Sequence, residues 1–207
     1  MQFWHNKFDL DKTFFTSDLH FHHKNLCRGV SNWEDTSSCR DFDTLDDMNH
    51  AILTSINENV GQDDTLFCLG DWSFGSHTKV GEFRKRIYCE NVILLYGNHD
   101  DKIRKLQSLQ KYFAWCGDYL EIACQKEQGL KVPSLITLSH YAHRVWRDSH
   151  KGTIELHGHS HGTLPGVGKS FDMGWDVWEK PVSLRHIINS LEDIEINHVD
   201  HHRADFK

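Results

Sequence analysis

Five short blocks of the chain combine aspartate, asparagine and histidine, side chains with which proteins hold divalent metal ions. In order they are Asp18-Leu19-His20, Gly70-Asp71, Gly97-Asn98-His99-Asp100, Ser139-His140 and Gly158-His159-Ser160-His161. Any one block could be an ordinary turn at the end of a strand, because Gly, Asn and Asp are common there. Together they offer too many ligands for one ion and about the right number for two. The set therefore predicts a two-metal hydrolase that acts on a phosphate ester.

Apolar runs precede these blocks and predict the strands that would position them. The expected strands cover residues 12–17, 65–69, 91–96, 119–124, 135–139 and 153–157. Helical patterns are expected at 45–56, with Asp43 or Thr44 as the N-cap, and at 79–88, 101–110 and 182–191. Alternating strands and helices indicate an α/β fold. Because loops at the carboxyl ends of strands meet at one sheet edge, we expect the blocks to converge.

Length and composition limit the functions that are open to the chain. The 207 residues suffice for one substantial core, and we expect a single domain over 1–207. A net charge of −7 argues against a broad surface that tracks nucleic-acid phosphates, but not against a nucleotide or a nucleic-acid end as substrate. No signal peptide or membrane span is recognisable, and the six cysteines form no Cys-x-x-Cys pair. We expect a cytoplasmic protein with free thiols, encoded by a bacterium or by a phage.

In this order, the five blocks resemble the signature of the calcineurin-like metallophosphoesterase superfamily: Asp-x-His, Gly-Asp, Gly-Asn-His-Asp/Glu, His and Gly-His-x-His. The segments 16–26, 48–57 and 69–75 are similar to the small stand-alone phosphoesterases of bacteria and their phages. His22 stands where those proteins usually carry glycine, and its bulk is expected to alter the pocket or the substrate range. The resemblance implies two mixed β-sheets packed as a sandwich with flanking helices, a four-layer αββα fold.

The residues after Gly70-Asp71 separate the chain from two other branches of that superfamily. Protein serine/threonine phosphatases continue with Val-Asp-Arg-Gly, whereas residues 72–75 here read Trp-Ser-Phe-Gly, so the phosphate-binding arginine is absent. Purple acid phosphatases place a tyrosine ligand three residues after the aspartate, and Phe74 at that position cannot bind a metal.

The resemblance implies two divalent ions that share one bridging carboxylate, Asp71. One ion would be held by Asp18, His20, Asp71 and His161, and the other by Asp71, Asn98, His140 and His159. Carboxylate, amide and imidazole ligands without a thiolate suit Mn, Fe, Zn, Co or Ni better than Mg or Ca. Manganese is our working choice.

The same resemblance implies hydrolysis of a phosphate mono- or diester by in-line attack of metal-bound hydroxide. The substrate would be a small phosphate ester, such as a nucleotide, a cyclic nucleotide or a nucleic-acid end, and a diester is somewhat favoured. His99 and Asp100 are the expected catalytic residues. His99 would protonate the leaving oxygen or bind a phosphate oxygen, and Asp100 would either orient His99 or cap the next helix. His23, Asn25, Asn98 and His99 are the expected substrate contacts.

A non-catalytic, metal-binding interaction scaffold on the same fold is the alternative. Scaffold members of the superfamily usually lose ligands or the histidine after the asparagine, and both are intact here. A second motif, Gly-Val-Gly-Lys-Ser at 166–170, resembles part of a nucleotide-binding P-loop, but Thr163 occupies the position of a required glycine, so we predict a loop.

The sequence leaves several features open. Four arginines could bind a second phosphate or a base, or could be ordinary surface charges: Arg28, Arg40, Arg144 and Arg147. Three histidines near the end of the chain could form an adventitious metal patch: His198, His201 and His202. The identity of the substrate and the oligomeric state cannot be read from the residues.

Overall fold

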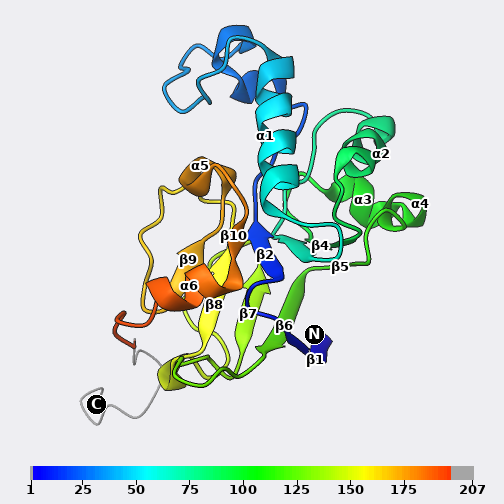
Figure 1. Cartoon of the computed structure of the whole chain (residues 1–207). Coiled ribbons are helices and arrows are strands. Elements are labelled where there is room, and N and C mark those ends of the chain that lie inside the picture. Colours follow the sequence, from blue (N-terminus) through cyan, green and yellow to red (C-terminus); the bar gives the residue numbers. More distant parts are fainter. Residues whose placement is uncertain (1, 197–207) are drawn as a thin grey trace.

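A computed structural model describes residues 2–196, and in it the chain folds into two five-stranded mixed sheets (Figure 1). The first sheet contains, in order across it, β1 (Gln2–Phe8), β6 (Tyr119–Cys124), β7 (Ile136–Ser139), β8 (Ile154–His157) and β9 (Ser170–Asp172). The second contains β10 (Val182–Ser183), β2 (Thr13–Thr16), β3 (Thr65–Cys68), β4 (Asn91–Leu95) and β5 (Trp115–Gly117). The expected α/β fold with two mixed sheets and flanking helices is confirmed.

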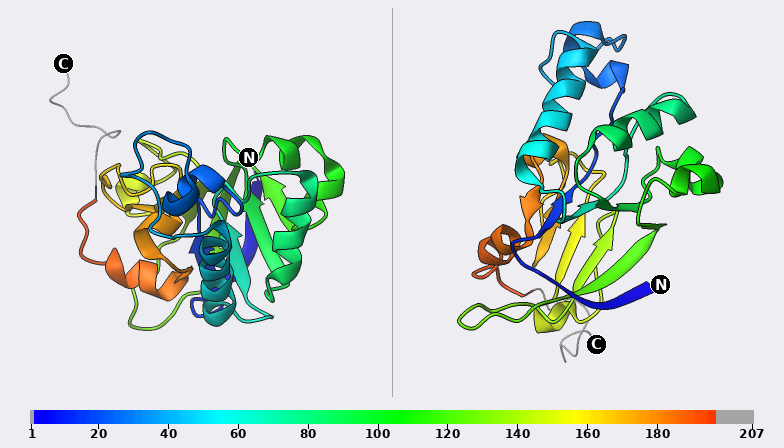
Figure 2. Two further views of the ribbon diagram at one scale, coloured as in Figure 1. Left: turned by 90° about the horizontal axis from the view of Figure 1, so that it is seen from above. Right: turned by 45° about the vertical axis from the view of Figure 1, so that its right-hand side comes forward.

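The two longest helices pack against the second sheet. The α-helices are α1 (Leu45–Asn59), α2 (His77–Arg86), α3 (Asp101–Lys105), α4 (Gln107–Gln110), α5 (Trp175–Trp178) and α6 (Leu184–Ser190). Three short 3₁₀ turns are η1 (Lys24–Leu26), η2 (Arg28–Val30) and η3 (Ser149–Lys151). The right-hand view of Figure 2 shows the helices of residues 45–110 gathered apart from the strands of residues 119–172.

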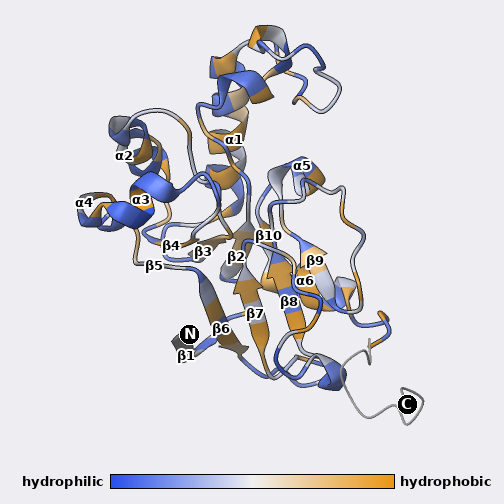
Figure 3. Cartoon of the chain, turned by 180° about the vertical axis from the view of Figure 1, so that it is seen from behind, coloured by the Kyte–Doolittle hydropathy of each residue, from blue (hydrophilic) through white to orange (hydrophobic). Residues whose placement is uncertain are grey.

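Strand alternation divides the core into two parts. In β3 and the residue after it, Leu66 and Cys68 pack in the cluster that contains the buried residues of α1 and α2, whereas Phe67 and Leu69 pack in the cluster shared by the two sheets. Successive side chains of a strand point to opposite faces, so one central strand serves both layers. Figure 3 shows the matching pattern, with hydrophobic β7 and β8 and a largely hydrophilic α3.

Two of the expected helices differ in detail from the structure. The pattern at 101–110 forms two short helices, because Leu106 is extended between them. The segment 182–191 begins as strand β10, and its helix starts only at Leu184, where the Ser183 side chain accepts a hydrogen bond from the backbone of His186. At α1 the N-cap is Thr44, whose side chain accepts from the Asp47 amide.

Parallel strands bring the five blocks to one junction between the sheets. β2, β3 and β4 run parallel in one sheet, and β7, β8 and β9 run parallel in the other. The residues after these strands are tied together by backbone hydrogen bonds, such as Asp18 N to Gly70 O at 3.0 Å and Gly158 N to His140 O at 3.0 Å. The blocks therefore occupy neighbouring loops, as the sequence predicted.

The structure also bears on the cysteines, on membrane-spanning helices and on the Gly-Val-Gly-Lys-Ser segment. All six cysteines are free, and five of them are buried. In the described part of the chain, no helix is long and apolar enough to cross a membrane. The Gly-Val-Gly-Lys-Ser segment leads into strand β9 and not into a helix, unlike a P-loop. His198, His201 and His202 lie outside the described residues.

Candidate metal centre

The backbone at this junction adopts conformations that L-residues seldom use. Left-handed φ values occur at five of the expected ligands: Asp18 (54°), His20 (50°), Asp71 (56°), His159 (67°) and His161 (48°). Each costs roughly 1–2 kcal/mol relative to the ordinary region. Such strain persists only where the surroundings impose it, and it gathers at functional sites.

Three donor atoms converge in the first group, which consists of Asp18, His20 and His161. The two imidazole rings are nearly parallel, with 3.3 Å between their Nε2 atoms. Asp18 Oδ1 lies 4.0 Å from His20 Nε2 and 3.8 Å from His161 Nε2. An ion about 2.1 Å from each of its ligands keeps them roughly 3–4 Å apart, so these separations fit a shared divalent ion.

A second group contains Asp71, whose Oδ2 atom lies between the rings of His20 and His140. This oxygen lies 3.6 Å from His20 Nε2 on one side and 3.7 Å from His140 Nε2 on the other. Asp18, Asp71 and His140 form the second set of converging donor atoms, and all three are buried. His140 also contacts Asn98, with 3.1 Å between Nε2 and Oδ1, while its Nδ1 contacts the Leu69 carbonyl at 2.8 Å. Asp71 Oδ2 thus lies between the His20 and His140 rings, and Asp18 belongs to both converging groups.

Glycine is required beside these carboxylates because the space is filled. A methyl group at Gly97 would overlap the carboxylate of Asp71, and one at Gly158 would overlap Asp18 and Ser17. The carboxylates therefore pack directly against neighbouring backbone. The hard and borderline donors and the tight packing fit divalent metal ions.

Burial perturbs the titration of these groups. Burial raises the pKa of Asp18 to about 6, although His161 and the amide of His159 act to lower it. Burial, together with the nearby charges of Arg40 and His161, holds the pKa of His20 well below its ordinary value, and burial also lowers the pKa of His140. Neutral imidazoles are the form that binds metals, and a cation would favour the ionised carboxylate.

His159 occupies a different place from the other expected ligands. Its backbone amide donates to both carboxylate oxygens of Asp18, at 3.1 and 2.9 Å, and its ring lies against His140 and Tyr141. His159 belongs to neither of the two converging groups of Asp and His side chains, whereas Asn98 Oδ1 lies 3.1 Å from His140 Nε2. Their assignment as ligands stays a prediction.

Asp100 does not cap the next helix, which was one of the two roles expected of it. Its side chain makes no capping hydrogen bond to α3. Instead Oδ2 accepts from the backbone amides of Asp71 and Gly97, at 2.8 and 2.9 Å, and Oδ1 accepts from the amide of Trp72 at 3.0 Å. Both oxygens thus accept hydrogen bonds from backbone amides. Asp100 is a buried support for the Asp71 loop, and burial raises its pKa to about 7.

His99 lies at the open side of the centre. Its side chain is 42% exposed, and its Nε2 is 3.9 Å from Asp71 Oδ2. The backbone amide of His99 donates to the other oxygen of Asp71 at 2.9 Å, which fixes the loop. The ring packs against Phe74 and His20. An exposed imidazole held beside the donor cluster can reach a bound substrate, as the proposed acid requires.

The other expected substrate contacts have structural partners. His23 Nδ1 accepts from the Leu26 amide at 3.1 Å, and the ring packs on Phe74. Asn25 Oδ1 accepts from the Asn32 amide at 3.2 Å. His22 has a φ of 66°, a left-handed value that glycine adopts most easily, and its ring packs against Phe21. His22 therefore occupies a backbone position that favours glycine.

Asp176 escaped the sequence interpretation, and Arg40 has a role that the sequence did not predict. Asp176 Oδ2 lies 2.6 Å from His161 Nδ1, and the guanidinium of Arg40 donates to both oxygens of Asp176. Arg40 is buried and paired, so it is neither a surface charge nor a free phosphate-binding group. Burial acts to raise the pKa of Asp176, but hydrogen bonds from His161 and Arg40 outweigh it and hold that pKa well below its usual range. The one available signal was position, because Asp176 closely follows β9, which is parallel to β8.

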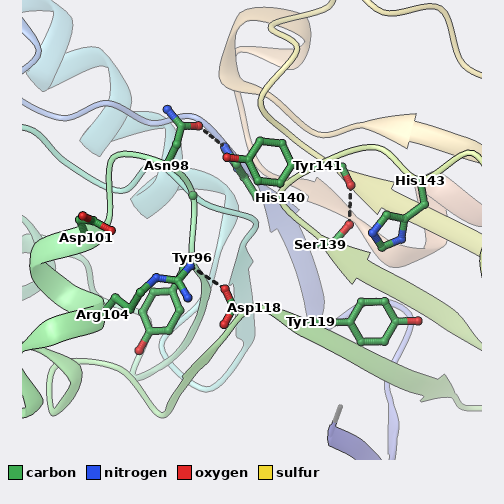
Figure 4. A pocket seen from close by; sticks show the side chains of 11 residues that line it. Tyr96, Asn98, Asp101, Arg104, Asp118, Tyr119, Ser139, His140, Tyr141 and His143 are labelled. Carbon is green, nitrogen blue, oxygen red and sulfur yellow. Dashed lines mark hydrogen bonds and ion pairs between the residues drawn. The ribbon is translucent and has the colours of Figure 1, made fainter.

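A cavity of about 480 Å³ adjoins the His140 side of the centre (Figure 4). Asn98 and His140 form one end, and Tyr96, Tyr119, Tyr141 and His143 supply aromatic walls. Arg104 lies over the ring of Tyr96 and pairs with Asp118. The volume is in the range of small-molecule sites, so an organic group attached to a phosphate at the centre could enter it.

Comparisons with known proteins agree with this geometry. A family model described as calcineurin-like phosphoesterase matches residues 12–199. The chain is 28% identical to the gene 66 protein of Mycobacterium phage D29, over 90% of this chain and 98% of the phage protein. It is 26% identical to the gene 66 protein of Mycobacterium phage L5, over 89% and 96% of the two chains. A crystal structure of a protein of unknown function from Aquifex aeolicus shares the fold, with a TM-score of 0.60 and 24% identity over 86% of this chain and 98% of that one.

Proposed function

The chain belongs to the calcineurin-like phosphoesterase family, and from that premise we propose that it hydrolyses a small phosphate ester with two divalent metal ions. The observation that carries this proposal is the position of Asp71 Oδ2, 3.6 Å from His20 Nε2 and 3.7 Å from His140 Nε2. A carboxylate oxygen between two sets of donors is what a bridging ligand requires.

The proposed first site uses Asp18, His20, Asp71 and His161, and the proposed second site uses Asp71, Asn98, His140 and His159. Ions bound there would activate a water molecule for in-line attack and neutralise charge on the phosphoryl group. Manganese is the ion that we expect, with Fe, Zn, Co and Ni as alternatives.

The protein's own side chains would do the remaining work. The exposed ring of His99 would donate a proton to the leaving oxygen or hold a phosphate oxygen. Asp100 would keep the Asp71 backbone in place through its three amide contacts. The aromatic cavity beside His140 would hold the organic part of the ester.

We favour a phosphodiester, such as a cyclic nucleotide, over a monoester. Arg40 beside the centre is paired with Asp176, and Arg104 in the lining of the cavity is paired with Asp118. A monoester dianion needs more positive charge than a diester monoanion, so paired arginines favour the diester. By similarity to phage proteins, we expect the reaction to take place in bacterial cytoplasm.

Turnover of two model substrates tests the proposal. Protein loaded with Mn²⁺ should hydrolyse bis-p-nitrophenyl phosphate faster than p-nitrophenyl phosphate. Asp71→Ala and Asn98→Ala should each lower turnover by at least about a thousandfold, because a ligand supports several kcal/mol of charge stabilisation. Asp41→Ala, which removes an exposed carboxylate paired with Arg28, is the control and should retain activity.

Two results would reject the assignment. Near-normal turnover in Asp71→Ala would exclude a bridging role for that carboxylate. Two bound ions without turnover of any phosphate ester would favour the alternative, a non-catalytic scaffold on this fold.

A further inference from the structure

We propose that Asp176 is a positioning residue for His161 and that Arg40 fixes it in place, an inference that rests on the proposed metal centre. Asp176 Oδ2 lies 2.6 Å from His161 Nδ1. The other ring nitrogen, Nε2, is the atom that faces Asp18 and His20. When a carboxylate accepts the Nδ1 proton of an imidazole, the lone pair is left on Nε2, where a metal ion would bind.

His161 needs such support more than the other converging ligands do. Its side chain is 32% exposed, whereas those of Asp18, His20, Asp71 and His140 are at most 5% exposed. Packing therefore holds those residues but leaves His161 partly free. Its backbone is also left-handed, and Gly162 follows it in the same region of φ. A short hydrogen bond to a fixed carboxylate can supply the orientation that packing does not.

Arg40 makes Asp176 a fixed point. The guanidinium is buried, and it donates from Nε to Asp176 Oδ1 at 2.7 Å and from Nη2 to Oδ2 at 3.0 Å. Its Nη2 and Nη1 atoms also donate to the backbone carbonyls of Asp18, at 2.6 Å, and Leu19, at 2.8 Å. One planar group thereby joins the Asp18–His20 loop to the carboxylate that orients His161. Lysine has no such fork and could not replace all four contacts.

The competing explanation is that the Arg40–Asp176 ion pair only stabilises the fold. The positioning role and this structural role make different predictions for metal binding. If Asp176 orients His161, its loss should weaken the first site and spare the second, which does not use His161. If the pair only stabilises the fold, its loss should lower the stability of the metal-free protein and affect both binding steps alike or neither.

Calorimetric titration of the metal-free full chain with Mn²⁺ tests the proposal, supported by metal content after gel filtration. We expect two ions in the unaltered protein. In Asp176→Ala, one of the two steps should weaken by about 10–100-fold, the usual effect of removing such a partner. Asp176→Asn keeps an acceptor but loses the charge, so its affinity in that step should lie between those of the unaltered protein and Asp176→Ala. Arg40→Lys should also weaken the same single step.

Asp11→Asn is the matched control, because Asp11 accepts a bidentate pair from Arg185 at 2.5 and 2.7 Å on the exposed surface. It should bind two ions as the unaltered protein does. Asp176→Asn keeps the test valid if Asp176→Ala fails to fold. Unchanged affinities in Asp176→Asn and Arg40→Lys, or equal weakening of both steps, would overturn the proposal. No metal binding by the unaltered protein would instead reject the proposed function itself.

Discussion

Asp100 holds Asp71 by its backbone: Oδ2 of Asp100 accepts the amide hydrogen of Asp71 at 2.8 Å. The same carboxylate accepts from Trp72 and Gly97, the neighbours of Asp71 in sequence and in space. Since Asp71 Oδ2 lies 3.6 Å from His20 Nε2 and 3.7 Å from His140 Nε2, the position of this carboxylate, which we propose as the bridging ligand, depends on the buried side chain of Asp100.

Replacement of Asp100 by asparagine should therefore disturb the fold and the centre together. The NH2 group of the new asparagine would face a backbone N–H and could not accept a hydrogen bond from it. A buried unsatisfied donor costs about 1–3 kcal/mol. We expect a loss of that size in the free energy of unfolding, measured by urea titration of the metal-free protein, together with weaker binding of Mn²⁺. A loss of stability without any change in metal affinity would show that Asp100 does not position Asp71.

Removal of the His99 imidazole should slow hydrolysis most for substrates with a basic leaving group. We expect His99→Ala to lower kcat about 10²–10⁴-fold for an alkyl phosphodiester and far less for a p-nitrophenyl ester, whose leaving group needs no proton. His50→Ala, on the exposed face of α1, should have no effect. Equal losses with both kinds of ester would contradict a role as general acid.

Metal ions should stabilise the folded chain measurably. The carboxylates at the centre are buried close together on left-handed backbone, and ions that bind only the folded state add about 2.7 kcal/mol per site at a hundredfold excess over Kd. For a chain of this size that corresponds to roughly 5–10 °C in Tm for each site. Thermal unfolding with EDTA and after addition of Mn²⁺ measures the shift, and Asp71→Ala should lose most of it. Identical melting curves would count against the metal centre.

Tyr141 should contribute to the binding of aromatic esters. Its ring is half exposed at the edge of the cavity and packs against His159. Stacking on such a ring is worth about 1–3 kcal/mol, so Tyr141→Ala should raise KM for bis-p-nitrophenyl phosphate about 5–150-fold with little change in kcat. Tyr141→Phe keeps the ring and is the matched control. An unchanged KM in Tyr141→Ala would place the organic group elsewhere.

Glu155 should make stability depend on pH. It is fully buried in β8, beside Ser139 and Ser170, and burial raises its pKa above the ordinary value of 4.5. Above pH 4.5 the unfolded chain releases this proton first, so the stability of the folded state falls as pH rises toward the native pKa. Glu155→Gln should remove that part of the slope. Urea unfolding of both proteins from pH 4 to pH 8 tests this, and parallel curves would refute it.

The sequence by itself determined the strands and the blocks that follow them. Apolar runs such as 65–69 and 91–96 predict buried strands, and glycine and aspartate end them, so the convergence of Asp71, Asn98 and His140 follows from local pattern and sheet geometry. The strand at 2–8 and the short strand at 115–117 were missed. The division of 101–110 into two helices was also missed, because Leu106 matches a helical pattern yet is extended.

Only the tertiary structure decided what supports the centre. Arg40 and Asp176 are 136 residues apart in the sequence. Asp100 accepts hydrogen bonds from the backbone of Trp72 and Asp71, which precede it by 28 and 29 residues. Their residue types are compatible with caps, turns or surface charges, and no local pattern distinguishes these uses. The distinction arises when folding buries a charge and leaves it only certain partners, because a buried charge must be paired.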